Sequence, residues 1–287
     1  MIKLEKDGLM LEISSPGETY RGTRFDWNAA FHRIEYKGRS FADKWYDTRE
    51  DPLKHDNLRG PSEEFKGILP VREGWLKIGV GILAREGDSG QYDMFHTYPI
   101  LRSGVRSQKA GKSSAVFRDI LEGYYGLEKT VRIGAAGEFI LTHALQNLGE
   151  EVLPIMNYNH NFFTFGLPAV GKGRRIILPR PFFGNWREDS VGAAQEGLSI
   201  VMTSALAENE KSCMTDIVVP GAATPEEGYS FILEGENGLR VEASCDAPLH
   251  HAQFWSNYKV SCWEPFVAQD LQPGGTFRWN IRYRLSF

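Results

Sequence analysis

The chain of 287 residues is long enough for two average domains or for one large all-β unit. Its 41% hydrophobic and 24% charged residues are ordinary for a soluble globular protein with a sizeable core, which argues against a disordered chain. The formal net charge of −4 and the pI near 6.0 provide no overall attraction for nucleic acid or for an anionic membrane. We therefore expect a neutral or small partner.

Strand-like runs recur along the chain, separated by clusters of Gly, Pro, Asn and Asp. Helical periodicity is nearly absent, and its best candidate is a short stretch near Val191–Glu196. The runs are Leu9–Ser14, Tyr20–Trp27, Arg33–Phe41, Trp75–Ala84, Val116–Leu121, Lys129–Ile133, Glu138–Leu145, Pro154–Phe165, Arg174–Leu178, Leu198–Thr203 and Phe254–Cys262.

The C-terminal part gives the clearest local signals. The runs Tyr229–Leu233 and Leu239–Ala243 flank an Asn237-Gly238 step, which favours a hairpin turn. Apolar and polar residues then alternate strictly over Phe277–Phe287, which predicts a strand with one buried face. Many strands without intervening helices predict a large antiparallel β-sandwich. No repeat, linker or composition break divides the chain, so we expect a single domain over residues 1–287.

Two segments are predicted to be long loops, Asp47–Glu64 and Arg102–Ser114. Long loops in a compact β protein are often functional. The second carries Arg102, Arg106 and further basic residues, which could meet a phosphate or an acidic sugar. The alternative is a solvated basic loop.

The cysteines and the N-terminal residues indicate the cellular compartment in which the protein is expected. Cys213, Cys245 and Cys262 are odd in number and none forms the C-x-x-C spacing of a zinc or redox site, which predicts buried thiols and no metal. The N-terminus is charged where a secretory signal would need an apolar stretch of about 7–15 residues. No later apolar run approaches the roughly 18–20 residues of a membrane helix. We expect a cytoplasmic protein.

Two segments carry candidate chemistry. Asn157–Phe163 (NYNHNFF) places His160 among amides and aromatic rings, where an imidazole can transfer a proton and its neighbours can contact sugar hydroxyls and C–H faces. Glu264 follows a tryptophan in an apolar strand end, a setting that suits a general base. A packed or solvent-facing histidine and a paired structural glutamate are the alternatives.

These segments resemble the galactose mutarotases, or aldose 1-epimerases. Asn157–Phe163 is similar to their Asn-x-x-His-x-Tyr-Phe motif, Gln253–Asn257 (QFWSN) to their Gln-x-Tyr-Thr-x-Asn strand, and Leu271–Gly274 (LQPG) to their Leu-x-Pro-Gly turn. Order and approximate spacing agree over about the last 130 residues. The resemblance is to a divergent member, because the family's early Asn-Arg and His-Gly signatures are missing in their usual form.

The resemblance implies the β-sandwich fold and a cofactor-free interconversion of sugar anomers. His160 would be the general acid toward the ring oxygen and Glu264 the general base on the anomeric hydroxyl. Substrate-binding roles would fall to Asn157, Gln253 and Trp255.

The remaining site residues are assigned by position and type. We expect Arg24 and His96 to stabilise developing charge on oxygen and Asp216 to hold sugar hydroxyls. A structural ion pair between Arg24 and Asp26, or a loop-anchoring His96, would be the competing account. His250 and His251 are adjacent, so on a strand they would point to opposite faces and could not readily share a ligand.

Other activities remain open at this stage. A non-catalytic carbohydrate-binding sandwich would retain the aromatic rings and amides but would have no need of the His160–Glu264 pair. A lyase or hydrolase could use the same sandwich, although canonical glycoside hydrolysis needs two carboxylates and the sequence clearly offers only Glu264.

Overall fold

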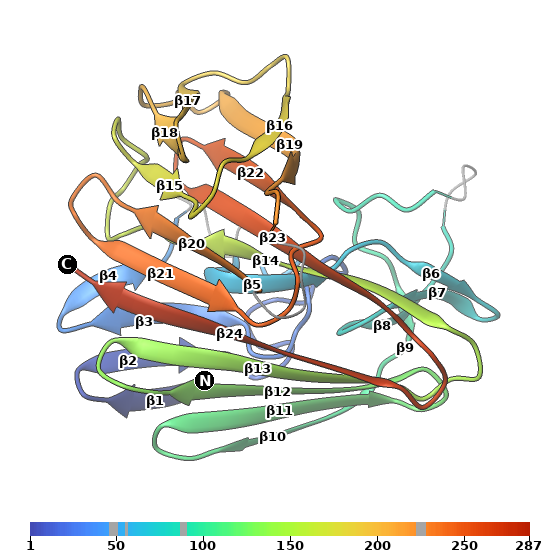
Figure 1. Cartoon of the computed structure of the whole chain (residues 1–287). Coiled ribbons are helices and arrows are strands. Elements are labelled where there is room, and N and C mark those ends of the chain that lie inside the picture. The colour runs from blue at the N-terminus through green and yellow to red at the C-terminus, as the bar shows by residue number, and fades with distance from the viewer. Residues whose placement is uncertain (46–50, 55–56, 87–90, 222–227) are drawn as a thin grey trace.

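The computed structural model describes residues 1–45, 51–54, 57–86, 91–221 and 228–287. Over these residues the chain forms 24 strands and no α-helix, and each pair of neighbouring strands is antiparallel (Figure 1). The predicted large antiparallel β-sandwich is thus confirmed. Among the same residues there is no helix with the length and apolarity required to cross a membrane.

Ten strands form the largest sheet, in the order β10-β11-β12-β13-β24-β21-β20-β15-β18-β17. They are β10 (Val105–Ala110), β11 (Ser114–Leu121), β12 (Tyr125–Ile133), β13 (Glu138–Asn147), β24 (Thr276–Ser286), β21 (Arg240–Cys245), β20 (Tyr229–Glu234), β15 (Arg175–Ile177), β18 (Ser199–Met202) and β17 (Ala193–Glu196).

A six-stranded sheet carries the candidate site, in the order β16-β19-β22-β23-β14-β5. Its strands are β16 (Phe183–Trp186), β19 (Lys211–Val218), β22 (His251–Asn257), β23 (Ser261–Leu271), β14 (Leu153–Phe162) and β5 (Gly60–Phe65). The edge strand β5 comes from the N-terminal third of the chain and pairs with β14 from its middle.

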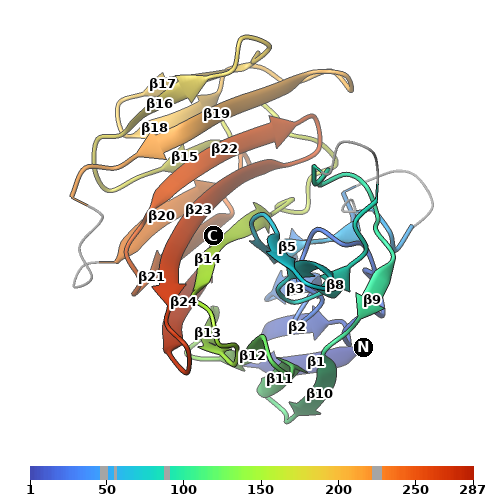
Figure 2. The same ribbon diagram turned by 90° about the vertical axis from the view of Figure 1, so that its right-hand side faces the viewer.

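Two four-stranded sheets complete the molecule. The first contains β1 (Ile2–Lys6), β2 (Leu9–Ile13), β3 (Phe31–Tyr36) and β4 (Arg39–Ala42), and the second contains β6 (Leu69–Val71), β7 (Gly74–Lys77), β8 (Gly81–Leu83) and β9 (Ile100–Arg102). In Figure 2, the long curved strands β22 and β23 lie to one side of the blue and teal strands of these two sheets.

The core lies between the two large sheets and is built from their alternating apolar residues. Val131 and Ile281 from the ten-stranded sheet share one buried cluster with Phe254 and Trp263 from the six-stranded sheet. In β24 the expected alternation is confirmed, because every second residue from Trp279 to Leu285 is buried. The predicted hairpin around Asn237-Gly238 is formed by β20 and β21.

A buried ion network also joins the two large sheets. The Nζ atom of Lys129 on β12 contacts the carboxylates of Glu63 on β5 and Asp26, the latter at 3.0 Å. Nε2 of His143 lies 2.6 Å from Oε1 of Glu63, and Asn159 donates to the same carboxylate. Burial alone would raise the pKa of Glu63, but His143 and Lys129 lower it, and the net pKa lies well below the ordinary value. Glu63 is therefore an ionised carboxylate inside the core.

One of the two predicted loops is wrong. The middle of Arg102–Ser114 forms β10, which pairs with β11 as the edge of the ten-stranded sheet, and its two end residues belong to β9 and β11. The side chains of β10 are mostly exposed, so the strand lacks the apolar alternation that sequence reasoning relies on. Of the other segment, residues 47–50 and 55–56 lie outside the described residues, and its last part, from Gly60, belongs to β5.

Two secondary-structure predictions are also wrong. The short helix near Val191–Glu196 is instead β17, which pairs with β18 at the other edge of the large sheet. The run Tyr20–Trp27 forms no strand. Its side chains bind other elements instead, since Asp26 pairs with Lys129 and Arg24 with Glu64.

The three cysteines are buried and unpaired, as expected. Burial raises the pKa of Cys213 to about 11 and that of Cys245 to about 12. The pKa of Cys262 is raised well above its ordinary value, again by burial. The three thiols are therefore protonated and weakly reactive at neutral pH.

The ion network gives a test of stability. We expect Lys129→Met to lower the free energy of unfolding by about 3–5 kcal/mol, because it leaves buried carboxylates without their cation. Urea denaturation measures the change. The control is Arg118→Met, which removes a 2.6 Å contact with Glu128 between side chains that are 60% and 43% exposed, and it should cost less than about 1 kcal/mol. Equal losses in the two variants would contradict the role given to the buried network.

Candidate functional site

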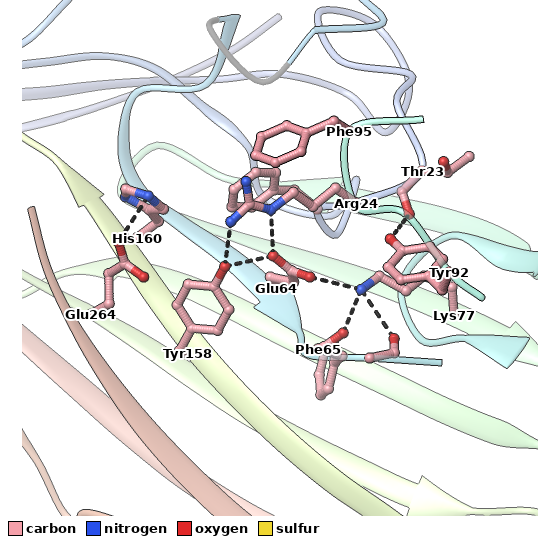
Figure 3. Close-up of polar contacts among 12 residues, drawn as sticks. Thr23, Arg24, Glu64, Phe65, Lys77, Tyr92, Phe95, Tyr158, His160 and Glu264 are labelled. Carbon is pink, nitrogen blue, oxygen red and sulfur yellow. Dashed lines mark hydrogen bonds and ion pairs between the residues drawn. The ribbon is translucent and has the colours of Figure 1, made fainter. Parts of the chain in front are cut away.

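His160 and Glu264 are in direct contact on neighbouring strands of the six-stranded sheet. His160 lies on β14 and Glu264 on β23, and Nε2 of the imidazole is 3.0 Å from Oε1 of the carboxylate (Figure 3). Both residues are 5% exposed. Nδ1 of His160 is buried and has no hydrogen-bond partner among the described residues. One ring nitrogen is thus held by the carboxylate while the other is uncommitted.

Aromatic rings frame this pair. Phe162 stacks on the imidazole of His160 with ring centroids 4.0 Å apart, and Trp255 meets the same imidazole edge-on at 5.5 Å. Phe25 lies 6.1 Å from it. An apolar frame of this kind strengthens the electrostatic interaction inside it and offers faces on which sugar C–H groups can pack.

Arg24 belongs to a second polar cluster beside the pair. Its Nε donates to Oε2 of Glu64 at 2.6 Å and its Nη2 to the hydroxyl of Tyr158 at 2.9 Å. The Tyr158 hydroxyl donates in turn to Oε2 of Glu64, and Nζ of Lys77 donates to Oε1 at 2.9 Å. The ring of Tyr158 lies 6.3 Å from that of His160, so the cluster adjoins the pair (Figure 3).

The charges of this cluster follow from burial and pairing. Burial alone would raise the pKa of Glu64, but Lys77 and Arg24 lower it, and the net pKa lies below the ordinary value. Burial and the neighbouring Glu64 raise the pKa of Tyr158 well above its usual range. At neutral pH Glu64 is therefore a carboxylate and Tyr158 a neutral phenol that donates its proton in a hydrogen bond.

His96 lies farther out, on the loop before β9. It lines a cavity of about 510 Å³ together with Arg24, Thr23 and Tyr20. Its Nε2 is 3.2 Å from Oε2 of Glu86, and its side chain is 50% exposed. Arg24 and His96 therefore share a cavity, but no contact joins His96 to the His160–Glu264 pair.

The other predicted site residues lie on different faces of the sheet. Gln253 is the cross-strand neighbour of Glu264, and the alternation along β22 places Gln253 and Trp255 on the face of His160. Asn157 is on the opposite face, since it alternates with Tyr158 along β14. Both polar side-chain atoms of Asn157 are buried and have no partner among the described residues.

Asp216 sits at an irregularity of β19. The register of β19 with β22 shifts between Met214 and Ile217, and Asp216 adopts a positive φ of 53°. Its exposed carboxylate accepts from Thr215 at 3.0 Å and from Asn185 at 3.4 Å. Bulges with such conformations often redirect a side chain near a functional site. The structure brings Asp216 to the same sheet as the pair but gives it no direct contact with either member.

The prediction for His250 and His251 is wrong. Their Nδ1 atoms lie 2.7 Å apart, because β22 begins at His251 and His250 therefore does not follow the strand alternation. The ring of His251 stacks on Phe266, which stacks on Tyr158. The described residues contain no group of three or more His, Cys, Asp or Glu side chains that could hold a metal ion.

Sequence reasoning missed Glu64, Lys77 and Tyr158. Glu64 lies in a segment that was predicted to be a loop, and no motif marks Lys77. Tyr158 stands inside the Asn157–Phe163 motif, where alternation with His160 could have placed its hydroxyl on the same face.

Comparisons with known proteins agree with this fold. No protein-family model matches the chain, and no curated protein matches its sequence. Among solved structures, the chain is similar to a galactose mutarotase-like protein from Lactobacillus casei, with 12% identity, a TM-score of 0.61 and coverage of 100% of both chains. A GalM/aldose epimerase homologue from C. elegans has 11% identity and a TM-score of 0.57, over 99% of this chain and 98% of that chain.

A third similar structure is the galactose 1-epimerase from Lactobacillus acidophilus. It has 11% identity and a TM-score of 0.52, over 99% of this chain and 93% of that chain. These likenesses extend over nearly the whole chain, so they concern the architecture rather than one motif. The chain therefore has the galactose mutarotase-like fold.

His251, whose ring stacks on Phe266 beside Tyr158, gives a testable prediction. Burial, followed by the charges of His250 and Lys66, lowers the pKa of His251 from 6.5 to about 4. The folded state thus resists protonation, so the stability that depends on neutral His251 is complete above pH 6.5 and is lost as the pH falls toward 4. An NMR titration of the imidazole proton should give a pKa near 4. Lys66→Met should raise it, whereas Lys3→Met on β1 should not. A wild-type value near 6.5 would contradict the burial argument.

Proposed function

We propose that this protein is an aldose 1-epimerase-type isomerase that interconverts sugar anomers by acid–base ring opening. The contact between His160 and Glu264 carries the proposal. A proton donor and a proton acceptor lie within hydrogen-bond distance of each other. Aromatic rings surround the two groups, and the same face of the sheet carries Gln253 and Trp255. The resemblance of both segments to mutarotase motifs, and the fold itself, support it further.

The reaction needs two proton transfers, each at an oxygen atom that is bonded to the anomeric carbon. Glu264 takes the proton of the anomeric hydroxyl, and protonated His160 gives a proton to the ring oxygen as the bond from that oxygen to the anomeric carbon breaks. The aldehyde rotates about its bond to the next carbon, and the reverse transfers close the ring in the other configuration. An acid and a base on opposite sides of the sugar ring would suffice for these transfers. Because both reacting oxygens belong to one carbon, side-by-side groups can also serve, and the sugar then replaces the contact within the pair.

The other predicted residues receive supporting roles in this proposal. Arg24 stabilises negative charge that develops on oxygen, and Trp255 and Gln253 contact the sugar's C–H face and hydroxyls. His96 and Asp216 contact the more distant parts of the substrate. Asn157 has no direct substrate contact in this scheme, because it faces the other side of the sheet.

The proposed function also implies a cellular location, a substrate class and a functional unit. Unpaired buried thiols support a cytoplasmic location, where cysteines stay reduced. We propose a small sugar or sugar derivative as the substrate, no cofactor, and the whole chain as one functional unit. A hydrolase is less well supported, because Glu64, the ionised carboxylate of the adjoining cluster, is already bound by Lys77 and Arg24.

One observation favours a second candidate, a carbohydrate-binding module without catalysis. His160 and Glu264 bind each other directly at 3.0 Å, and both residues are only 5% exposed. A buried pair with a purely structural role would have the same geometry. In that case the aromatic rings and Gln253 alone would bind sugar, and the pair would only stabilise the sheet.

Substitution of Glu264 separates the two candidates. Glu264→Gln keeps the shape and the contact with His160 but removes the basicity, so it should slow anomer exchange by on the order of 10²-fold or more. Sugar affinity should change by less than about tenfold, since proton transfer acts in the transition state. Saturation-transfer NMR on glucose, galactose, glucuronate and glucose 6-phosphate measures both quantities.

His160→Asn provides the companion variant. It should slow exchange similarly, and the double variant should lose less than the product of the two single effects, because the pair acts as a unit. A wild-type protein that binds one of these sugars and leaves its exchange rate unchanged would exclude the isomerase and favour the binding module.

A further inference from the structure

The short strand β5 carries two adjacent buried glutamates that serve different faces of the sheet. All six of its residues are buried. Glu63 points between the two large sheets, where it meets Lys129 and His143. Glu64 points the other way, toward the face of His160, because successive side chains of a strand alternate. The two carboxylates are thus of one type, in one strand and at similar depth, but in different surroundings.

Each oxygen of Glu64 is engaged. Oε2 accepts from Nε of Arg24 at 2.6 Å and from the Tyr158 hydroxyl at 2.5 Å, and Oε1 accepts from Lys77 at 2.9 Å. Lys77 is completely buried and also donates to the carbonyl oxygens of Phe65 and Gly67. Three acceptors use the three N–H groups of an ammonium ion, so Lys77 has none left for a ligand.

Arg24 still has N–H groups to donate, because a guanidinium carries five and its bonds to Glu64 and Tyr158 use two of them. Its Nε and Nη2 are bound to Glu64 and Tyr158, and Nη1 has no hydrogen-bond partner among the described residues. Arg24 also lines the cavity of about 510 Å³ beside Phe95, whose ring lies 5.8 Å from the guanidinium carbon (Figure 3). Two cations and one carboxylate leave the cluster with one surplus positive charge. Because Lys77 is saturated, this charge is available only at Arg24.

We propose that Glu64 is a positioning residue of the sugar site: by accepting from Arg24, Tyr158 and Lys77 together, it holds the guanidinium of Arg24 in one orientation beside the His160–Glu264 pair. In this arrangement Nη1 is presented to an electron-rich oxygen of the sugar, and Lys77 balances the charge of Glu64 so that Arg24 keeps its own. The inference rests on the proposed function for its effect on catalysis, but the orientation of Arg24 can be measured without it.

The neighbouring glutamate provides the matched control. Glu64→Gln and Glu63→Gln both remove a buried carboxylate charge that balances a lysine, so both should destabilise the fold. Only Glu64→Gln should release Arg24. We expect it to lower kcat/KM for anomer exchange by on the order of tenfold to a hundredfold, whereas Glu63→Gln should change it by less than about twofold. Saturation-transfer NMR with glucose and galactose measures both variants.

The orientation of Arg24 has its own spectroscopic readout. The Nε–H resonance of Arg24, identified by its loss in Arg24→Lys, should be protected from solvent exchange in the wild type because it donates to Glu64. It should remain protected in Glu63→Gln and become unprotected in Glu64→Gln. If Glu64→Gln does not fold, Tyr158→Phe takes its place, since it keeps every charge and removes only the hydroxyl that Arg24 and Glu64 share. It should lower the protection and kcat/KM by about threefold or more.

The results separate this inference from the proposed function. A folded Glu64→Gln or Tyr158→Phe variant with unchanged protection and unchanged kcat/KM would overturn the positioning role, as would equal losses of activity in Glu63→Gln and Glu64→Gln. A wild-type protein that exchanges no anomers would overturn the isomerase instead. The positioning of Arg24 would then be decided by the protection of its Nε–H in the two glutamine variants.

Discussion

The fold depends on keeping two adjacent carboxylates ionised inside a buried strand. A buried carboxylate without a partner is costly, and Glu63 and Glu64 stand side by side in β5. Each has its own lysine, Lys129 from the ten-stranded sheet and Lys77 from β7. The two lysines come from different sheets, so neutralising β5 requires the sheets to be in their final places. An electrostatic requirement of one strand thereby fixes the relation of three sheets.

The same strand sets the geometry of the candidate site. β5 pairs with β14 so that Glu64 lies opposite Tyr158 and Ser62 opposite His160. A shift of one residue would turn each glutamate to the wrong face, away from its lysine, so the charges hold the register. On its other side β14 pairs with β23, and that separate register places His160 beside Glu264. The face of β5 that carries Glu63 and the face that carries Glu64 are therefore stabilised together.

The sequence predicted those parts of the fold and site in which neighbouring residues carry the signal. Strict alternation identified β24, and the Asn237-Gly238 step identified the hairpin of β20 and β21. Two local motifs selected His160 and Glu264 as candidates, and the structure places these two side chains in contact. The prediction was wrong for β5, because Glu63 and Glu64 make this segment polar, and polar segments are usually loops. The lysines that neutralise the two glutamates are distant in the sequence, so no local pattern indicates that the strand is buried. The alternative considered for Arg24, an ion pair with Asp26 two residues away, is wrong for the same reason, because its partner Glu64 lies 40 residues along the chain.

The long separations within these networks have a consequence for how the molecule reaches its native state. The contact from Asn159 to Glu63 spans 96 residues, that from Lys129 to Asp26 spans 103, and that from Tyr283 to Asn161 spans 122. Contacts of such high sequence separation form slowly. During synthesis, β5 leaves the ribosome long before β14 and β12 exist, so its glutamates remain hydrated until the middle of the chain has been made. Because the candidate site joins segments made at widely different times, we expect it to assemble after the local hairpins.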